Sequence, residues 1–280
     1  MNASTVKTEN ILLENGQLVI RLNVPQGLDK PYFDQFHADE LPTKAGIDKL
    51  DKLRFQDFLQ DAYALDYPES PEALINLLQN MSLATDEGQL NLAGVLLFAK
   101  RPEWIKPQFV VKAIRYPGND IHADTYLDTE DFSGALRKIY DDTLGFIMRN
   151  LHKVQAGRGV NSPGTPEIPS VVFEELLVNA LIHRDYLIDA PIRIFVYDNR
   201  IEIISPGHLP NNLTVAKIRS GNANCRNPIL VSYAAKGVLP YHGLGSGIRR
   251  ALKAFPDIDF EDDRAGNLFK VTVWRTATPT

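Results

Sequence analysis

The sequence has few of the features that would assign it to a specialised class. Cys225 is the only cysteine in 280 residues, so no disulfide bond can form within the chain and a reducing compartment is expected. The longest apolar runs, LAGVLLFA and ELLVNALI, are far too short to span a bilayer. The first residues, MNASTVKTEN, lack the basic start and apolar stretch of a signal peptide. We therefore expect a cytoplasmic protein without a membrane segment.

Acidic residues outnumber basic residues, and the motif of a P-loop motor is absent from the sequence. The formal net charge of −5 argues against a strongly basic, nonspecific binder of nucleic acid, because phosphate affinity needs clustered lysine and arginine. No GxxxxGK[S/T] motif occurs, which rules out a P-loop motor. The six histidines are scattered, and no pair has the HExxH spacing of a zinc hydrolase. A nuclease or metallohydrolase is therefore a weak hypothesis.

What is present favours a globular α/β protein. The hydrophobic content of 44% is sufficient for a core of ordinary size. Alternating or β-branched segments predict strands at 17–24, 109–116, 191–198, 200–207 and 268–275. Helical periodicity predicts helices at 46–66, 71–81, 90–100, 132–151, 173–186, 229–238 and 246–255. The stretch at 156–170 is dense in glycine and proline, which makes it the best candidate for a domain boundary.

The helix expected at 173–186 carries a polar stripe beside its apolar one. Glu175, Asn179 and His183 are spaced by four residues, which places them close together on one side of a helix. A carboxylate can activate water, and an amide oxygen can bind Mg²⁺. The stripe is therefore either a solvated surface or part of a metal–nucleotide site. Taken alone, the helix favours the solvated surface, because most such stripes are solvated.

A glycine-rich segment, HGLGSGIRR at 242–250, comes directly before the last expected helix. Gly243, Gly245 and Gly247 would let the backbone approach a phosphate, to which the helix N-terminus offers unpaired N–H groups. The spacing is not that of a dinucleotide-binding fingerprint, and a tight turn before a helix explains it equally well. The basic residues that follow, Arg249, Arg250 and Lys253, would suit an acidic partner or a few phosphates, but we favour a solvated helix face.

Taken together and in order, these segments resemble a known family. FEELLVNALIHRDY, YDNRIEIISPGHLP, CRNPIL and YHGLGSGIRR resemble the C-terminal part of bacterial transcriptional regulators of the Schlafen AlbA type, a part often labelled RecG-related. LVIRLNVPQGLDKPYF resembles the last strand of the AlbA-type domain, and LNLAGVLLFAKRPEWIKPQFVVKAIRYPGND resembles the segment between the two named domains. The resemblance implies an AlbA-type tail at 1–45, a connecting helical and α/β domain at 46–160, and a nucleotide-binding domain at 165–276.

The last of these domains is similar, more remotely, to the GHKL ATPases. That resemblance implies a two-layer α/β sandwich in the C-terminal half, after a smaller mixed α/β region. It also implies that Glu175 activates the attacking water and that Asn179 holds Mg²⁺. The other residues that it implies for nucleotide binding are His183, Ser205, Gly207, Arg226, Gly243, Gly245 and Gly247.

The chain departs from the GHKL pattern at the adenine site. GHKL proteins carry Asp-x-Gly-x-Gly after the second strand of the hairpin, whereas residues 205–209 read SPGHL. Ser205 therefore stands where a carboxylate would bind the adenine amino group, although Gly207 is retained. Residues 208–227 occupy the position of the GHKL lid, with Arg219 and Arg226 as candidates to face phosphate.

Two functional hypotheses of different classes follow. The first is a module that binds ATP, another nucleotide or a small-molecule effector within a transcriptional regulator, at most a weak ATPase and not a helicase motor. DNA would then be bound only through domains reduced to a tail or missing from this chain, such as the winged-helix domain that often follows in the family. The second is a non-catalytic scaffold for interaction or homodimerisation, which the serine at position 205 favours.

Overall fold

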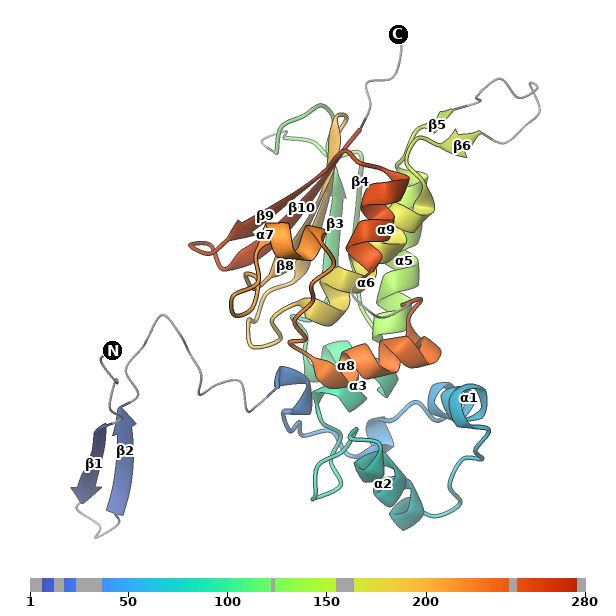
Figure 1. The fold of residues 1–280 in the computed structure, drawn as a ribbon. Coiled ribbons are helices and arrows are strands. Elements are labelled where there is room, and N and C mark those ends of the chain that lie inside the picture. The colour runs from blue at the N-terminus through green and yellow to red at the C-terminus, as the bar shows by residue number, and fades with distance from the viewer. Residues whose placement is uncertain are drawn as a thin grey trace. The chain divides into compact units, whose positions relative to one another are not determined.

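The computed structural model describes residues 7–12, 18–23, 37–121, 124–154, 164–241 and 246–275 (Figure 1). The chain divides into two compact units, Met1–Phe36 and His37–Thr280. In the first unit, β1 (Lys7–Leu12) pairs antiparallel with β2 (Leu18–Asn23). β2 confirms the strand expected at 17–24, whereas β1 was not expected. Most of the expected 156–170 linker lies outside the described residues.

Short helices open the second unit. They are η1 (Ala38–Glu40), η2 (Ile47–Lys49), α1 (Lys52–Tyr63), α2 (Pro71–Asn80), α3 (Leu92–Phe98) and α4 (Pro102–Ile105). Every residue of α3 is buried, and the side chain of Asn91 caps it by accepting the N–H of Gly94 at 2.8 Å. The aromatic rings of Phe58 and Phe98 pack against Tyr233 of α8 (Pro228–Tyr233), with centroids 5.3 and 5.8 Å apart. These contacts join the helical region to the C-terminal half.

The second unit is built on a six-stranded sheet with the order β4-β3-β7-β8-β10-β9. Its strands are β3 (Val111–Arg115), β4 (Asp128–Phe132), β7 (Ile192–Val196), β8 (Arg200–Pro206), β9 (Ile258–Asp263) and β10 (Leu268–Trp274). β3 and β7 are parallel, and all other neighbours are antiparallel. The expected hairpin and the position of β10 beside β8 are confirmed. β3 and β4 belong to the expected connecting segment, yet they extend the same sheet.

Three helices, α5 (Leu136–Arg149), α6 (Ser170–His183) and α9 (Gly247–Ala254), cover one face of this sheet (Figure 1). Ile194, Ile203 and Val271 are among the buried residues in the core with these helices. α6 is apolar on nearly all sides because it contacts β8 as well as α5 and α9. The α/β two-layer arrangement expected for the C-terminal half is therefore confirmed.

Smaller elements complete the second unit. They are β5 (Lys153–Val154), β6 (Thr165–Pro166), α7 (Val215–Arg219) and a π-type turn, η3 (Ala234–Val238). α7 lies within residues 208–227, for which no regular structure was expected, and the Thr214 hydroxyl caps it by accepting the N–H of Lys217 at 3.3 Å. None of the helices in the described ranges is long and apolar enough to cross a membrane.

Candidate functional site

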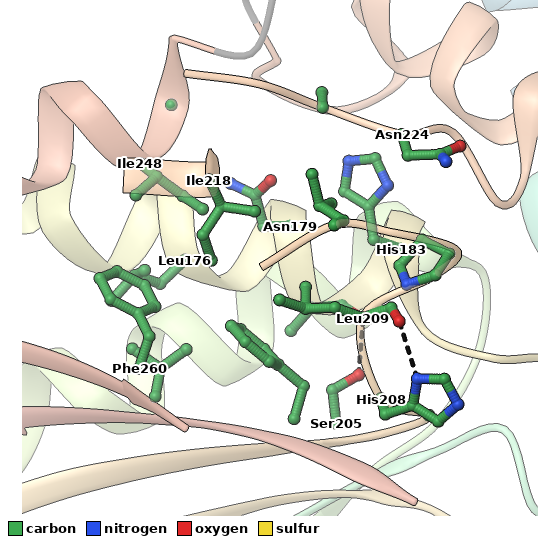
Figure 2. A pocket seen from close by; sticks show the side chains of 18 of the residues that line it. Leu176, Asn179, His183, Ser205, His208, Leu209, Ile218, Asn224, Ile248 and Phe260 are labelled. Carbon is green, nitrogen blue, oxygen red and sulfur yellow. Dashed lines mark hydrogen bonds between the residues drawn. The ribbon is translucent and has the colours of Figure 1, made fainter. Parts of the chain in front are cut away.

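A pocket lies between α6, the sheet, the 208–227 segment and the start of α9. In Figure 2, Asn179 and His183 of α6 border it together with Ser205 of β8 and Phe260 of β9. Its volume is about 100 Å³, below the range of roughly 300–1,000 Å³ typical of small-molecule sites. The lining residues are Leu176, Asn179, Ala180, His183, Ile203, Ser205, Gly207, His208, Leu209, Pro210, Leu213, Ile218, Asn222, Ala223, Asn224, Tyr241, Gly247, Ile248, Phe260, Phe269 and Val271.

The lining is apolar apart from a few neutral polar groups. Among the described residues that line it, none is a lysine, arginine, aspartate or glutamate. Asn179 is partly buried, and its Nδ2 donates to the Glu175 carbonyl oxygen at 2.7 Å. Oδ1 is the acceptor end of this amide and the atom that would bind a metal, and Nδ2 carries a second hydrogen as well. An amide oxygen is a type of ligand that Mg²⁺ accepts. Mg²⁺ binding by Asn179 stays a prediction.

Glu175 lies one turn before Asn179 and is only 3% exposed. Its Oε1 forms an ion pair with Nη2 of Arg250 from α9 at 2.5 Å. The other oxygen, Oε2, is buried and has no hydrogen-bond partner among the described residues. The interpretation of this stripe as a solvated surface is therefore wrong, because α9 packs over it. The catalytic role expected for Glu175 stays a prediction, and in this conformation the carboxylate is engaged by an arginine.

Gly247 is the one of the three glycines at 243, 245 and 247 that lies within the described residues, and it is directly against this carboxylate. A Cβ atom at position 247 would stand 2.5 Å from Glu175 Oε2 and 3.2 Å from Asn179 Nδ2. A side chain at position 247 would therefore displace the Glu175 carboxylate from its place against α9. Gly243 and Gly245, expected to frame the phosphates, lie outside the described residues.

His183 ends α6 and faces the same pocket as Asn179 (Figure 2). Burial, with a smaller contribution from the positive Arg226, lowers the pKa of His183 to about 4. The imidazole is therefore neutral at pH 7 and offers one donor and one acceptor. It adds hydrogen-bonding capacity to the pocket without adding charge.

Ser205 and Gly207 lie at the end of β8. The Ser205 hydroxyl is buried and donates back to the Ala180 carbonyl oxygen of α6 at 3.3 Å (Figure 2). Because the residue is a serine, this position provides no carboxylate where GHKL proteins bind the adenine amino group. Gly207 has φ +97°, and a Cβ there would approach Arg226 Nη1 and Asp185 Cβ to 2.5 Å. Only glycine suits both this backbone conformation and this space.

The arginines expected to face phosphate are directed elsewhere. Arg226 does not line the pocket, and its Nη2 donates to the His208 carbonyl oxygen at 2.9 Å. Arg219 donates to the Ile258 carbonyl oxygen of β9 at 2.6 Å. Arg219 thus fixes the 208–227 segment to β9, whereas the Arg226 bond joins the two ends of the segment to each other. A role for Arg226 in nucleotide binding stays a prediction.

Several residues of the motifs prove to be structural. Asn227 is fully buried, and its Nδ2 donates to the carbonyl oxygens of Ile182 and Arg184, both at 2.9 Å. These bonds tie the end of the 208–227 segment to the C-terminal end of α6. The Arg184 guanidinium in turn donates to the Ala190 carbonyl oxygen at 2.6 Å and holds the turn before β7. Sequence reasoning missed these roles and that of Arg250, because each depends on a partner distant in sequence or on a backbone carbonyl.

No cluster of three or more histidine, cysteine or acidic side chains in the described ranges is arranged to hold a metal ion. A metal in this pocket would therefore rely on Asn179 and on oxygens of the ligand itself. Mg²⁺ accepts such an arrangement, because it commonly keeps several waters and binds substrate phosphates with one or two protein ligands. Asn179 therefore fits a magnesium ion that is bound mainly by water and ligand phosphate. Ser205 does not fit the contact that a carboxylate makes to adenine in GHKL proteins.

The fold and the pocket define a two-layer α/β domain with a small pocket between α6 and its sheet. Residues 189–272 match the model of a family described as "Putative ATP-dependent DNA helicase recG C-terminal". This segment is similar to the RecG-related C-terminal family, which is the resemblance that the sequence motifs predicted. α6, which carries Glu175 and Asn179, precedes the matched segment.

A solved structure extends the comparison to most of the chain. The DIP2311 protein from Corynebacterium diphtheriae is similar with a TM-score of 0.62 and 20% identity, over 97% of this chain. The match spans 58% of that protein's chain, and at this identity it shows a shared fold alone. A search of curated proteins finds no match.

Proposed function

We propose that the C-terminal half is a nucleotide-binding module of a bacterial transcriptional regulator, with ATP as the first ligand to test. One observation carries the proposal: Asn179, His183, Ser205, Gly207 and Gly247 border the same pocket, although they come from three separate elements. If the α6 stripe were a solvated surface and the glycine-rich segment an ordinary turn, we would not expect their residues to border one pocket. The family description, which names an ATP-dependent protein, supports the same choice of ligand.

Binding is better supported than hydrolysis. Glu175 is paired with Arg250, so its carboxylate is held by a cation in this conformation instead of being free to activate a water molecule. The sequence also lacks the phosphate-binding motif of a helicase motor. We propose a ligand-sensing role with at most weak ATPase activity. Because the pocket is small, a nucleotide requires the 208–227 segment to move outward.

Titration calorimetry with ATP and Mg²⁺ tests the proposal. We expect Asn179→Ala to abolish binding, because it removes the oxygen that would hold the metal. Glu175→Ala should retain binding and remove any hydrolysis, because the carboxylate acts on water rather than on the nucleotide. Asn80→Ala is the matched control, since this asparagine is exposed at the end of α2. Equal ATP affinity in the wild type and Asn179→Ala would refute the metal-ligand role.

The second hypothesis, a non-catalytic scaffold, has specific support of its own. Ser205 replaces the adenine-binding carboxylate, and the pocket of about 100 Å³ is small for a nucleotide. A scaffold would bind no nucleotide and would form a homodimer at micromolar concentration in analytical ultracentrifugation. A monomer that binds ATP would exclude it.

We propose that DNA is bound by other domains of such a regulator rather than by this module. The formal charge of −5 gives no general attraction to phosphate. A mobility-shift assay at physiological salt should show weak, salt-sensitive binding or none. Tight, sequence-selective binding by these residues would overturn the assignment of this chain as the ligand-binding part.

A further inference from the structure

The ion pair between Glu175 and Arg250 lies at the N-terminus of α9. Glu175 comes from the middle of α6, and its carboxylate is 4% exposed, whereas the Arg250 side chain is 35% exposed. Both side chains keep an unused polar atom, because Glu175 Oε2 and Arg250 Nε are buried without a hydrogen-bond partner among the described residues. The ion pair is thus formed while one polar atom of each side chain still has no hydrogen-bond partner among the described residues.

The position of the carboxylate is one that favours an anion. Oε2 lies against Gly247, the first residue of α9, where the helix presents unpaired N–H groups and the positive end of its dipole. Side chains on a helix lean toward its N-terminus, so the Arg250 guanidinium is carried back over this same turn. Gly247 and Asn179 both line the pocket. Glu175 therefore occupies a cationic corner at the edge of the pocket.

We propose that this corner binds the anionic group of the ligand, and that Arg250 exchanges Glu175 for a ligand phosphate. The inference rests on the proposed function and deepens it. The lining residues that the structure describes provide no positive charge, so Arg250 is the cation best placed to neutralise a phosphate. Arginine suits the task because its planar guanidinium binds carboxylates and phosphates through the same paired donors.

The exchange makes Glu175 responsive to the ligand. Without an anionic ligand, Arg250 holds the carboxylate against α9. When a phosphate takes the guanidinium, Glu175 is released beside Asn179, where it can orient a water or contact a metal. An uncharged ligand of similar shape would fill the pocket without releasing Glu175. The module would thus distinguish phosphorylated from unphosphorylated ligands.

The test compares ATP with adenosine, which lacks the phosphates, by calorimetry on the full chain. We expect Arg250→Ala to weaken ATP binding about 10- to 100-fold, the loss of one charge-assisted contact, and to leave adenosine binding unchanged. Arg250→Lys should restore part of the ATP affinity. Arg249→Ala is the matched control, because it removes the same charge from the exposed neighbouring position. Glu175→Gln should tighten ATP binding, since the competing carboxylate is gone.

The outcomes separate this inference from the proposed function. Loss of adenosine and ATP binding alike in Arg250→Ala would show that Arg250 only supports the fold of the pocket, and would overturn the exchange. Equal ATP affinity in Arg250→Ala and the wild type would also overturn it, while leaving nucleotide binding intact. If the wild type binds neither ATP nor adenosine, the proposed function fails, and the exchange fails with it.

Discussion

The buried ion pair between Glu167 and Arg275 provides a test of what anchors α6, the helix of the candidate site, to the sheet. Glu167 precedes α6, and Arg275 directly follows β10. Their side chains are 5% and 1% exposed. Arg275 donates from Nε and Nη2 to Glu167 Oε1 at 2.9 and 2.6 Å, and from Nη1 to the Tyr197 carbonyl oxygen at 2.6 Å. The pair therefore fastens the entry of the site helix to the end of the central hairpin and its neighbouring strand.

Arg275→Ala leaves the Glu167 carboxylate buried without its countercharge. The carboxylate keeps a bond from the backbone N–H of His152 to Oε1 at 2.9 Å, and the imidazole Nδ1 of the same residue lies 3.6 Å from Oε2. Removing one partner of such a pair costs about 3–5 kcal/mol in the free energy of unfolding. For a unit of this size, the loss corresponds to a melting temperature lower by roughly 6–20 °C. Denaturant unfolding followed by circular dichroism measures the free energy directly.

Two further variants make this reasoning refutable. Glu167→Gln introduced together with Arg275→Met should recover at least about 1 kcal/mol, because no unpaired charge remains. Arg137→Ala, which breaks an exposed pair with Asp141 on α5, should change stability by less than about 0.5 kcal/mol. A loss below about 1 kcal/mol for Arg275→Ala would show that water reaches Glu167 and that the pair does not anchor α6.

Three other predictions follow from the pocket. Gly207→Ala should lower the free energy of unfolding by at least about 2 kcal/mol more than Gly118→Ala, because both glycines have positive φ but only position 207 is crowded. Because the pKa of His183 is lowered to about 4, the unfolded state binds the extra proton first as pH falls. The free energy of unfolding should drop by up to about 3 kcal/mol between pH 6.5 and 4, and urea titrations should show a flatter profile for His183→Gln. Saturating ATP with Mg²⁺ should slow proteolysis within 208–227; cleavage at an unchanged rate would argue against a lid.

The predicted elements were those whose side chains alternate or repeat with the helical period. β7, β8 and β10 are rich in β-branched residues that face the core, so the local sequence alone predicts that they form strands. β4 and β9, the two edges of the sheet, were missed. Their sequences, DTEDF and IDFEDD, carry charges that protect an edge from further pairing and that also hide the period-two pattern.

The candidate site also combines features that the local sequence predicts with features that depend on distant segments. The spacing of four residues placed Glu175, Asn179 and His183 on one side of a helix, because helical geometry is local. Whether that side meets water is not local. It depends on α9 packing against α6, which brings Gly247 and Arg250 onto the stripe from more than sixty positions away. The sequence by itself thus determined the helix, the hairpin and the residues at which chemistry could occur. The tertiary structure alone decided that Glu175 is buried and paired, because burial and ion pairing arise from segments that meet only when the chain folds.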